Sequence, residues 1–308
     1  MSPLRQSLKD YLSIRRGLGY KLEGHERELS QYLDYLAARG QETVSVQSAV
    51  EWARLPAGVS PNRWADRLSF VRSFAVYLHA LDPAHEVPPD DLLPRGVQRL
   101  TPYLYSEEDL AALMAASSSL ASPLRSATYR TLIGLLAVTG MRVGEAVAVD
   151  KSDLDLASGV LTVREGKFGK TRALPLHDST IAALEAYLRL RDAHRSAPES
   201  EALLISQAGT RLIASCVGHT FRTLVGRAGL KPRSARCRPR PHDLRHSFAV
   251  ATLLDWYRSD VEVGPRLPLL STYLGHVHPK HTYWYLQAAP ELLGLAAGRL
   301  ERATGGQR

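Results

Sequence analysis

The sequence has only two cysteines in 308 residues, Cys216 and Cys237, and they lie far apart without metal-ligand spacing. A disulfide framework is therefore not indicated, and the composition fits a reducing cell interior. No run of about 18 apolar residues occurs, so no membrane span is expected. The first residues form no apolar signal core, and no internal repeat or long low-complexity segment is present.

The remaining composition is that of a globular protein, with 44% hydrophobic and 23% charged residues. The net charge of +8 favours a polyanionic partner, with nucleic acid preferred over an acidic membrane surface. Residues 1–100 contain 13 Lys and Arg against 12 Asp and Glu, whereas residues 101–308 contain 26 against 19. We therefore expect the polyanion site mainly in the second part of the chain.

Apolar residues at helical spacing predict an all-helical domain over residues 1–85. The helices are expected at residues 4–16, at about 29–36 with an end at Gly40, after the cap candidate Ser45, and at 68–78. Five prolines between residues 83 and 102, together with Gly96, then predict a linker, which we assign to residues 86–102.

Several larger side chains of this helical part have two interpretations. Trp52 and Trp64 are expected in the core rather than stacked on a nucleic acid. Arg63, Arg67 and Arg72 could contact phosphate, but a solvated helix face explains them equally well.

The second domain is expected over residues 103–290, followed by a C-terminal helix and tail at 291–308. Its apolar pattern predicts a buried helix at 126–138 and amphipathic helices thereafter. Residues 160–163 and 173–176 are predicted strands of a hairpin. The fold class is therefore mainly α with a small antiparallel β-sheet or hairpin, in two domains.

Charged residues follow the buried helix directly. Gly140 permits a turn, and a new helix is expected to begin at about Met141. Arg142 and Glu145 would then share one helix face. They form either a surface ion pair of little energetic weight or a functional arginine with a supporting acid.

The predicted hairpin has a basic tip containing Lys167, Lys170 and Arg172. Such a tip could lie in a DNA groove and bring a lysine to a phosphate or a leaving oxygen, although turns often carry lysine for solubility. It is not a nucleotide-binding P-loop, because the GxxxxGK[ST] spacing is absent.

Further along, the proline-broken segment 231–240 is strongly basic. Contact with phosphate is its simplest use, and a disordered basic loop is the alternative. The arginines that we expect at DNA are Arg233, Arg236, Arg238 and Arg240.

The stretch after Pro241 gathers the groups needed to attack a phosphodiester. His242 and Arg245 lie three residues apart on one helix face, whereas the neighbouring His246 could be structural. Arginine offers a planar fork for phosphate, histidine transfers protons near neutral pH, and tyrosine can act as a nucleophile. His276 and a tyrosine, Tyr285 or Tyr283, follow later in the chain.

Five motifs in this order make the chain resemble a tyrosine site-specific recombinase of the phage-integrase and Xer type. They are Thr139-Gly140-Met141-Arg142-Val143-Gly144-Glu145, Gly166-Lys167-Phe168-Gly169-Lys170, His242-Asp243-Leu244-Arg245-His246, Leu274-Gly275-His276, and a Tyr nine residues beyond that His. The resemblance covers about residues 103–290, and the N-terminal part resembles the family's core-binding domain in position and composition only.

The resemblance assigns roles to individual residues. Arg142 and Arg245 would bind the scissile phosphate, and Glu145 would support Arg142. His242 and His276 occupy the further active-site positions. Lys167 matches the hairpin lysine, with Lys170 as its competitor, and Tyr285 matches the nucleophile, with Tyr283 as its competitor.

The resemblance also implies a function, that of an integrase or transposase of a mobile element in the prokaryotic cytoplasm, associated with the nucleoid. Strands of specific double-stranded DNA sites would be cleaved and rejoined through a 3′-phosphotyrosyl intermediate, with no cofactor, metal or ATP. Four protomers would act on two duplexes, with or without companion recombinases, and segment 291–308 could be exchanged between protomers.

Three alternatives stay open at this point. The chain could be a DNA-binding accessory protein with an unused site, or a type IB topoisomerase that relaxes supercoils. The histidines between residues 276 and 281 could instead form a metal site, although no carboxylate or cysteine lies near them in the sequence.

Overall fold

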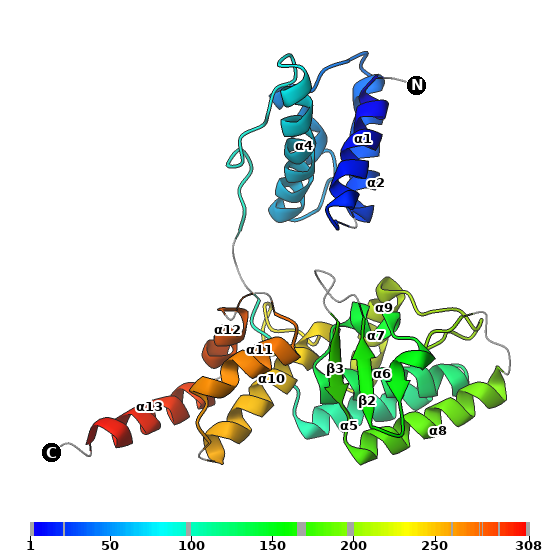
Figure 1. The fold of residues 1–308 in the computed structure, drawn as a ribbon, viewed down its shortest axis with the longest axis vertical. Coiled ribbons are helices and arrows are strands. Elements are labelled where there is room, and N and C mark those ends of the chain that lie inside the picture. The colour runs from blue at the N-terminus through cyan, green and yellow to red at the C-terminus, as the bar shows by residue number, and fades with distance from the viewer. Residues whose placement is uncertain are drawn as a thin grey trace. The chain divides into compact units, whose positions relative to one another are not determined.

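In the computed structural model the chain forms two compact units, Met1–Arg99 (unit 1) and Leu100–Arg308 (unit 2). The structure describes all residues except 1–2, 21, 97–99, 165–170, 196–199, 260, 277, 279, 289 and 306–308. Figure 1 shows the elements of each unit in chain order.

The described residues of unit 1 form a helical bundle (Figure 1). Its helices are α1 (Pro3–Gly17), α2 (Glu23–Ala37), α3 (Val46–Arg54) and α4 (Pro61–Leu81). The Ser45 hydroxyl accepts the backbone N–H of Ser48 and so caps α3. Gly40, which follows α2, has a φ of 63° that favours glycine. The four helices expected from the apolar spacing are confirmed.

The core of unit 1 contains a charged pair. The side chains of Arg67 and Glu28 are both buried, with Nη1 2.9 Å from Oε2. The Arg67 guanidinium also lies 3.7 Å above the centre of the Trp52 ring. Trp52 is buried as expected, but the suggestion that Arg67 contacts phosphate is wrong, because its guanidinium is enclosed within its own unit. Arg63 also binds Glu28, from the more exposed side.

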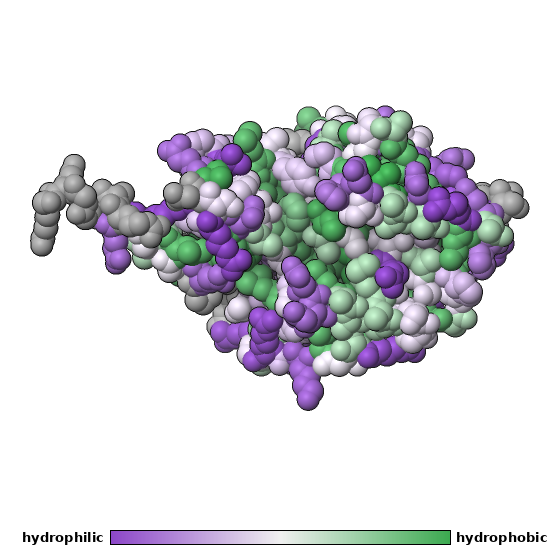
Figure 2. Space-filling view, turned by 90° about the horizontal axis from the view of Figure 1, so that it is seen from below, coloured by the Kyte–Doolittle hydropathy of each residue, from purple (hydrophilic) through white to green (hydrophobic). Residues whose placement is uncertain are grey.

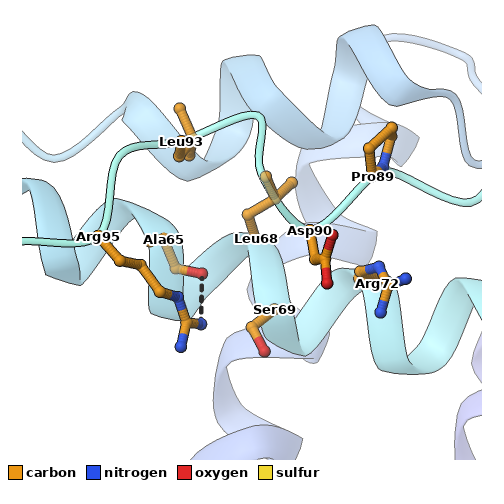
Figure 3. Close-up of a pocket in the computed structure, with 8 residues that line it drawn as sticks. All are labelled: Ala65, Leu68, Ser69, Arg72, Pro89, Asp90, Leu93 and Arg95. Atoms are coloured by element: carbon orange, nitrogen blue, oxygen red, sulfur yellow. Dashed lines mark hydrogen bonds between the residues drawn. The ribbon is translucent and has the colours of Figure 1, made fainter. Parts of the chain in front are cut away.

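The segment that follows α4 lies along this helix. Leu93 is buried in the core of unit 1, and Asn62 on α4 exchanges two hydrogen bonds with the backbone of Gly96, at 2.8 and 3.0 Å. Figure 3 shows the cavity of about 310 Å³ between this segment and α4, with Arg95 donating to the carbonyl of Ala65. The first part of the expected linker 86–102 therefore belongs to unit 1, and its described residues form no helix or strand.

Unit 2 combines helices with one small sheet (Figure 1). Its α-helices in the described residues are α5 (Glu107–Ala116), α6 (Pro123–Thr139), α7 (Val143–Ala148), α8 (Asp178–His194), α9 (Ala214–Arg227), α10 (Pro241–Arg258), α11 (Leu267–Tyr273), α12 (Lys280–Ala288) and α13 (Pro290–Gly305). Short 3-10 helices span Ser117–Ser119, Lys151–Asp153 and Gly264–Arg266. The predicted fold class, mainly α with a small antiparallel sheet, is confirmed.

Helix α6 is the centre of unit 2. Its apolar residues, among them Leu132, Ile133 and Leu136, are buried, and the helix packs against α5, α8 and α10. The near-continuous apolar run of residues 126–138 is explained by these neighbours on several sides. Helix α6 thereby positions the turn that follows it.

The sheet has strands β1 (Leu154–Asp155), β2 (Val160–Val163) and β3 (Arg172–Pro175), paired antiparallel in that order. Val163 faces Arg172 in the last pair of the β2–β3 ladder. Lys167 and Lys170, predicted at the hairpin tip, lie outside the described residues.

Helices α10 to α13 form a second layer of unit 2 around their own apolar cluster, which includes Leu253, Leu270 and Leu292. Helix α13 packs on α10 and α12 and projects from the side of the unit (Figure 1). Arg299 on α13 donates to the backbone carbonyls of Trp256, Tyr257 and Val261.

Apolar surface gathers across the face of unit 2 seen in Figure 2. A groove of about 500 Å³ lies between α5, α6 and α8, where Leu110, Met114, Val138 and Leu190 contribute to its lining. Within the described parts of the chain, no helix is both long and apolar enough to cross a membrane.

Candidate active site

The turn after α6 requires glycine. Gly140 has a φ of 59°, and a Cβ built on it would lie 2.5 Å from Cδ1 of Phe248. The backbone carbonyl of Gly140 accepts a hydrogen bond of 2.8 Å from Nη1 of Arg245. This turn therefore joins the end of α6 to an arginine on α10, 105 residues later in the chain.

Arg142 lies at the start of α7 rather than within it. Its backbone is extended (φ −77°, ψ 150°), and the helix begins at Val143. The expectation of a helix from Met141, with Arg142 and Glu145 on one helix face, is therefore wrong in its geometry. Glu145 instead folds back over the helix start and accepts the backbone N–H of Arg142 at 2.9 Å and Nη1 at 2.7 Å.

A second arginine binds the same carboxylate. Nη2 of Arg172 donates to Oε2 of Glu145 at 2.7 Å, and Nη1 donates to Oε1 at 3.2 Å. Burial alone would raise the pKa of Glu145, but the hydrogen bonds from Arg172 and Arg142 hold that pKa at about 2. The Arg172 side chain is only 10% exposed. The guanidinium of Arg172 is thus paired within the site, and the expected contact of Arg172 with DNA stays a prediction.

Arg245 is the most enclosed charge of the group. It is 2% exposed, and its Nη2 donates to the carbonyl of Leu274 at 2.5 Å. Burial and the neighbouring Arg142 lower the pKa of Arg245 to about 10, so the guanidinium stays charged at neutral pH. A buried cation held by backbone carbonyls is well prepared to bind an anion such as phosphate.

Tyr285 on α12 lies against this cation. It is 2% exposed, whereas Tyr283 is 49% exposed. Burial raises the pKa of Tyr285. Arg245 lowers it through its charge and through a hydrogen bond to Tyr285, and the charge of Arg142 also lowers it. Of the two candidate tyrosines, the structure brings only Tyr285 to the arginines.

Two histidines lie beside Tyr285, and a third packs on one of them. Its ring centre lies 6.0 Å from that of His276 and 5.4 Å from that of His246, and His246 lies 4.7 Å from His242. Burial and nearby positive charges lower the pKa of His276 and of His246 to about 3.

His242 lies at the more exposed side of the site. Its partial desolvation, followed by the charges of Arg245 and Arg142, lowers its pKa to about 4. All three rings are therefore neutral at pH 7 and can each accept a proton. Nδ1 of His276 lies 2.8 Å from Oγ1 of Thr282. If this hydroxyl donates, Nε2 of His276 carries a proton and can serve as a hydrogen-bond donor.

The basic segment before α10 differs residue by residue. Arg240 binds the buried carboxylate of Asp243 at 3.0 and 3.1 Å. Arg233 lies 4.5 Å above the ring of Tyr103 and donates to the carbonyl of Leu104. Arg236 and Arg238 are exposed. The segment thus presents at least two arginines to solvent and attaches two to its own unit.

The histidines of residues 276–281 do not form a ligand cluster in the part of the chain that the structure describes. There, no group of three or more His, Cys, Asp or Glu side chains is arranged to hold a metal ion. His276 faces Thr282 and Tyr285, and His278 is exposed.

Residues 104–291 match the sequence model of the phage integrase family. The chain belongs to this family. The integrase resemblance drawn from the motifs is confirmed, and the protein is an enzyme of the tyrosine recombinase class, whose members cleave and rejoin DNA.

The integrase is similar along its whole length to known proteins. It is 43% identical to the y4rB protein of Sinorhizobium fredii, provisionally named an integrase/recombinase, over 98% of each chain. It shares its fold with the Tn1549 transposon integrase in complex with transposon right end DNA (TM-score 0.62, 17% identity, 97% of this chain and 99% of that one). It also shares its fold with a lambda integrase tetramer bound to a Holliday junction (TM-score 0.57, 18% identity, 90% and 78%).

Two features of the integrase site had no signal in the sequence. Thr282, which holds His276, is an ordinary helix residue by pattern. The pairing of Arg172 with Glu145 joins residues 27 positions apart, and nothing in either motif connects them.

Proposed function

We propose that this integrase is the site-specific recombinase or transposase of a mobile element, and that Tyr285 forms a covalent 3′-phosphotyrosyl link with DNA. The observation that carries the proposal is the position of Tyr285. It is buried against Arg245, with the charge of Arg142 near and the neutral rings of His246 and His276 beside it.

In the proposed reaction the Oη of Tyr285 attacks the scissile phosphorus, and a P–O bond to Tyr285 forms as the bond to the 5′ oxygen breaks. The tyrosine proton passes to a neutral histidine. His242 is our candidate because of its place in the motif, and its lowered pKa leaves it unprotonated at pH 7. Lys167 would give a proton to the leaving 5′ oxygen. A 5′ hydroxyl of a second strand reverses the step.

In this proposal the arginines stabilise the negative charge that develops on the phosphate. Arg142 and Arg245, together with the N–H of His276, would bind the non-bridging oxygens, on which negative charge increases in the transition state. The phosphotyrosyl link conserves the energy of the phosphodiester, so the reaction needs no ATP, and the guanidinium pair fills the role that a metal has in other phosphoryl transfers.

Specific double-stranded DNA is the proposed substrate, and a tetramer on two duplexes is the proposed assembly. The DNA-bound Tn1549 integrase and the lambda integrase tetramer on a junction support this by their shared fold. Arg236 and Arg238 are our candidates for phosphate contact, since both are exposed. The proposed place of action is the nucleoid in a prokaryotic cytoplasm.

Helix α13 is the segment that we expect to pass to a neighbouring protomer. In the single chain it packs on its own unit through Leu292, while Leu293 is 52% exposed. Its projection from the side of unit 2 (Figure 1) supports this expectation.

A covalent-trapping assay tests the function. Wild type, Tyr285→Phe and the control Tyr283→Phe would be incubated with nicked suicide DNA from the flanks of the gene, with EDTA present. We expect a denaturant-resistant adduct with wild type and the control only, mapped to the peptide that contains Tyr285. An adduct with Tyr285→Phe would indicate that Tyr283 is the nucleophile. DNA binding without any adduct would favour an accessory protein, and relaxation of any plasmid by the monomer would favour a topoisomerase.

A further inference from the structure

Arg172 is the residue of the site whose role the motifs do not explain. It opens β3 as the ladder partner of Val163, in the last pair of strands β2 and β3. Its guanidinium lies directly beneath Gly275, where a Cβ would come within 3.0 Å of Nη1. The same Cβ would lie 3.7 Å from Nη1 of Arg142, so both guanidinium groups meet under this glycine.

Glu145 lies between the two arginines and is saturated by them. Oε1 accepts from Nη1 of Arg142 at 2.7 Å, and Oε2 accepts from Nη2 of Arg172 at 2.7 Å. With Arg172 present the three side chains carry a net charge of +1. Without it, Arg142 and Glu145 would form a neutral pair, and the carboxylate would compete with phosphate for the guanidinium of Arg142.

Burial of Arg172 carries a cost. Nε of Arg172 is buried and has no hydrogen-bond partner in the described parts of the chain, and a buried donor without a partner disfavours folding. Nε of Arg67 in unit 1 shares this feature, so the case for Arg172 rests on its bonds to Glu145 and its position beneath Gly275.

We propose that Arg172 is a positioning residue: by sharing the carboxylate of Glu145, it weakens the hold of that carboxylate on Arg142, keeps Arg142 oriented for the scissile phosphate, and joins the start of β3 to the phosphate site. This inference rests on the proposed function and adds to it a residue that acts through Glu145. Because the transition state carries more charge than the bound substrate, losing Arg172 reduces the cleavage rate more than it reduces DNA affinity.

The chain offers a matched control on the other strand of the hairpin. Arg164 lies directly before residues 165–170, as Arg172 follows them closely, and it binds the buried carboxylate of Asp153. Asp153 also accepts the backbone N–H of Asp150, at 3.0 Å. Arg164 and Arg172 thus each bind a buried carboxylate beside the strand pair. Of these two carboxylates, Glu145, the partner of Arg172, contacts Arg142 in the phosphate site.

The experiment measures single-turnover adduct formation on the suicide DNA and, separately, binding of uncut DNA. We expect Arg172→Gln to slow adduct formation about 10- to 100-fold, less than the loss for a direct transition-state donor, with DNA affinity changed by no more than about threefold. Arg172→Lys should recover part of the rate, because an ammonium can still reach one oxygen of Glu145. Arg164→Gln should stay within about threefold of wild type.

A double-mutant cycle with Glu145→Gln separates positioning from a general loss of structure. If Arg172 acts through Glu145, the double variant is about as slow as the slower single variant. Three outcomes would overturn the proposal. The rate losses of the two single variants could multiply in the double variant, or Arg172→Gln and Arg164→Gln could have equal rates. The third outcome is a loss of DNA affinity as large as the loss of rate. If Arg172→Gln does not fold, Arg172→Lys becomes the test, and a wild-type cleavage rate for Arg172→Lys would overturn the proposal.

Failure of the two ideas can be told apart. Absence of any adduct with wild type refutes the proposed function and this inference with it. Normal wild-type cleavage together with an unaffected Arg172→Gln refutes the role of Arg172 alone.

Discussion

Replacing Gly140 by alanine should damage both the fold and the reaction, for reasons that can be separated. The residue has a φ of 59°, where a side chain is strained, and a Cβ there would meet the Phe248 ring at 2.5 and 3.0 Å and Leu274 at 3.1 Å. These neighbours are ring and methyl carbons of a packed cluster, so they must move.

The magnitude follows from two contributions. The left-handed backbone costs alanine about 1 kcal/mol relative to glycine, and overpacking adds about 1–3 kcal/mol. Gly229 is a control for the first contribution alone: it has a φ of 71° and nothing within 4 Å of its Cβ position. We therefore expect Gly140→Ala to destabilise unit 2 by about 2–4 kcal/mol and Gly229→Ala by about 1 kcal/mol.

Thermal unfolding followed by circular dichroism measures the difference. For a unit of this size, about 1 kcal/mol shifts Tm by roughly 2–4 °C, so Gly140→Ala should melt several degrees below Gly229→Ala. Equal shifts for the two variants would refute the steric argument.

The same pair of variants tests the site. The carbonyl of Gly140 holds Arg245 at 2.8 Å, and displacing it should slow adduct formation at temperatures where both variants are folded. A cleavage rate for Gly140→Ala equal to that of the Gly229→Ala control would show that this carbonyl does not position Arg245.

Three further outcomes are expected. Burial lowers the pKa of His246 to about 3, so below about pH 6.5 the unfolded chain binds a proton that the folded chain does not. Unit 2 should therefore lose stability as the pH falls from 6.5 toward 3. In melts at several pH values, His246→Asn should reduce this dependence of stability on pH. Arg67→Met should destabilise unit 1 by about 2–4 kcal/mol by leaving the buried Glu28 short of one partner, and adding Glu28→Gln should restore part of the loss in urea titrations. Leu293→Asp should leave binding to a single site intact and weaken assembly on two sites in sedimentation, whereas unchanged assembly would argue against exchange of α13.

Much of the fold and the family membership could be predicted from the periodicity of apolar residues and the spacing of motifs. The helices of unit 1 and the buried run of residues 126–138 follow from apolar residues at helical spacing, since local backbone geometry dictates that pattern. The family follows from five motifs in order, since each keeps a chemical group at a fixed distance along the chain from the next.

Other features depended on which elements meet in space. Tyr283 and Tyr285 are two residues apart and so point about 200° apart around a helix. Periodicity therefore requires one to face inward and the other outward, but only the packing of α12 against α10 shows that Tyr285 faces Arg245.

The sequence by itself determined the chemical inventory of this integrase: its arginines, histidines and tyrosine, their order, and the helices that present most of them. The tertiary structure decided what each charge binds. Arg67 is buried against Glu28, and Arg172 binds Glu145. The physical reason is that a charge takes its partner from whatever lies within about 4 Å in space, and that neighbour can be any distance away along the chain.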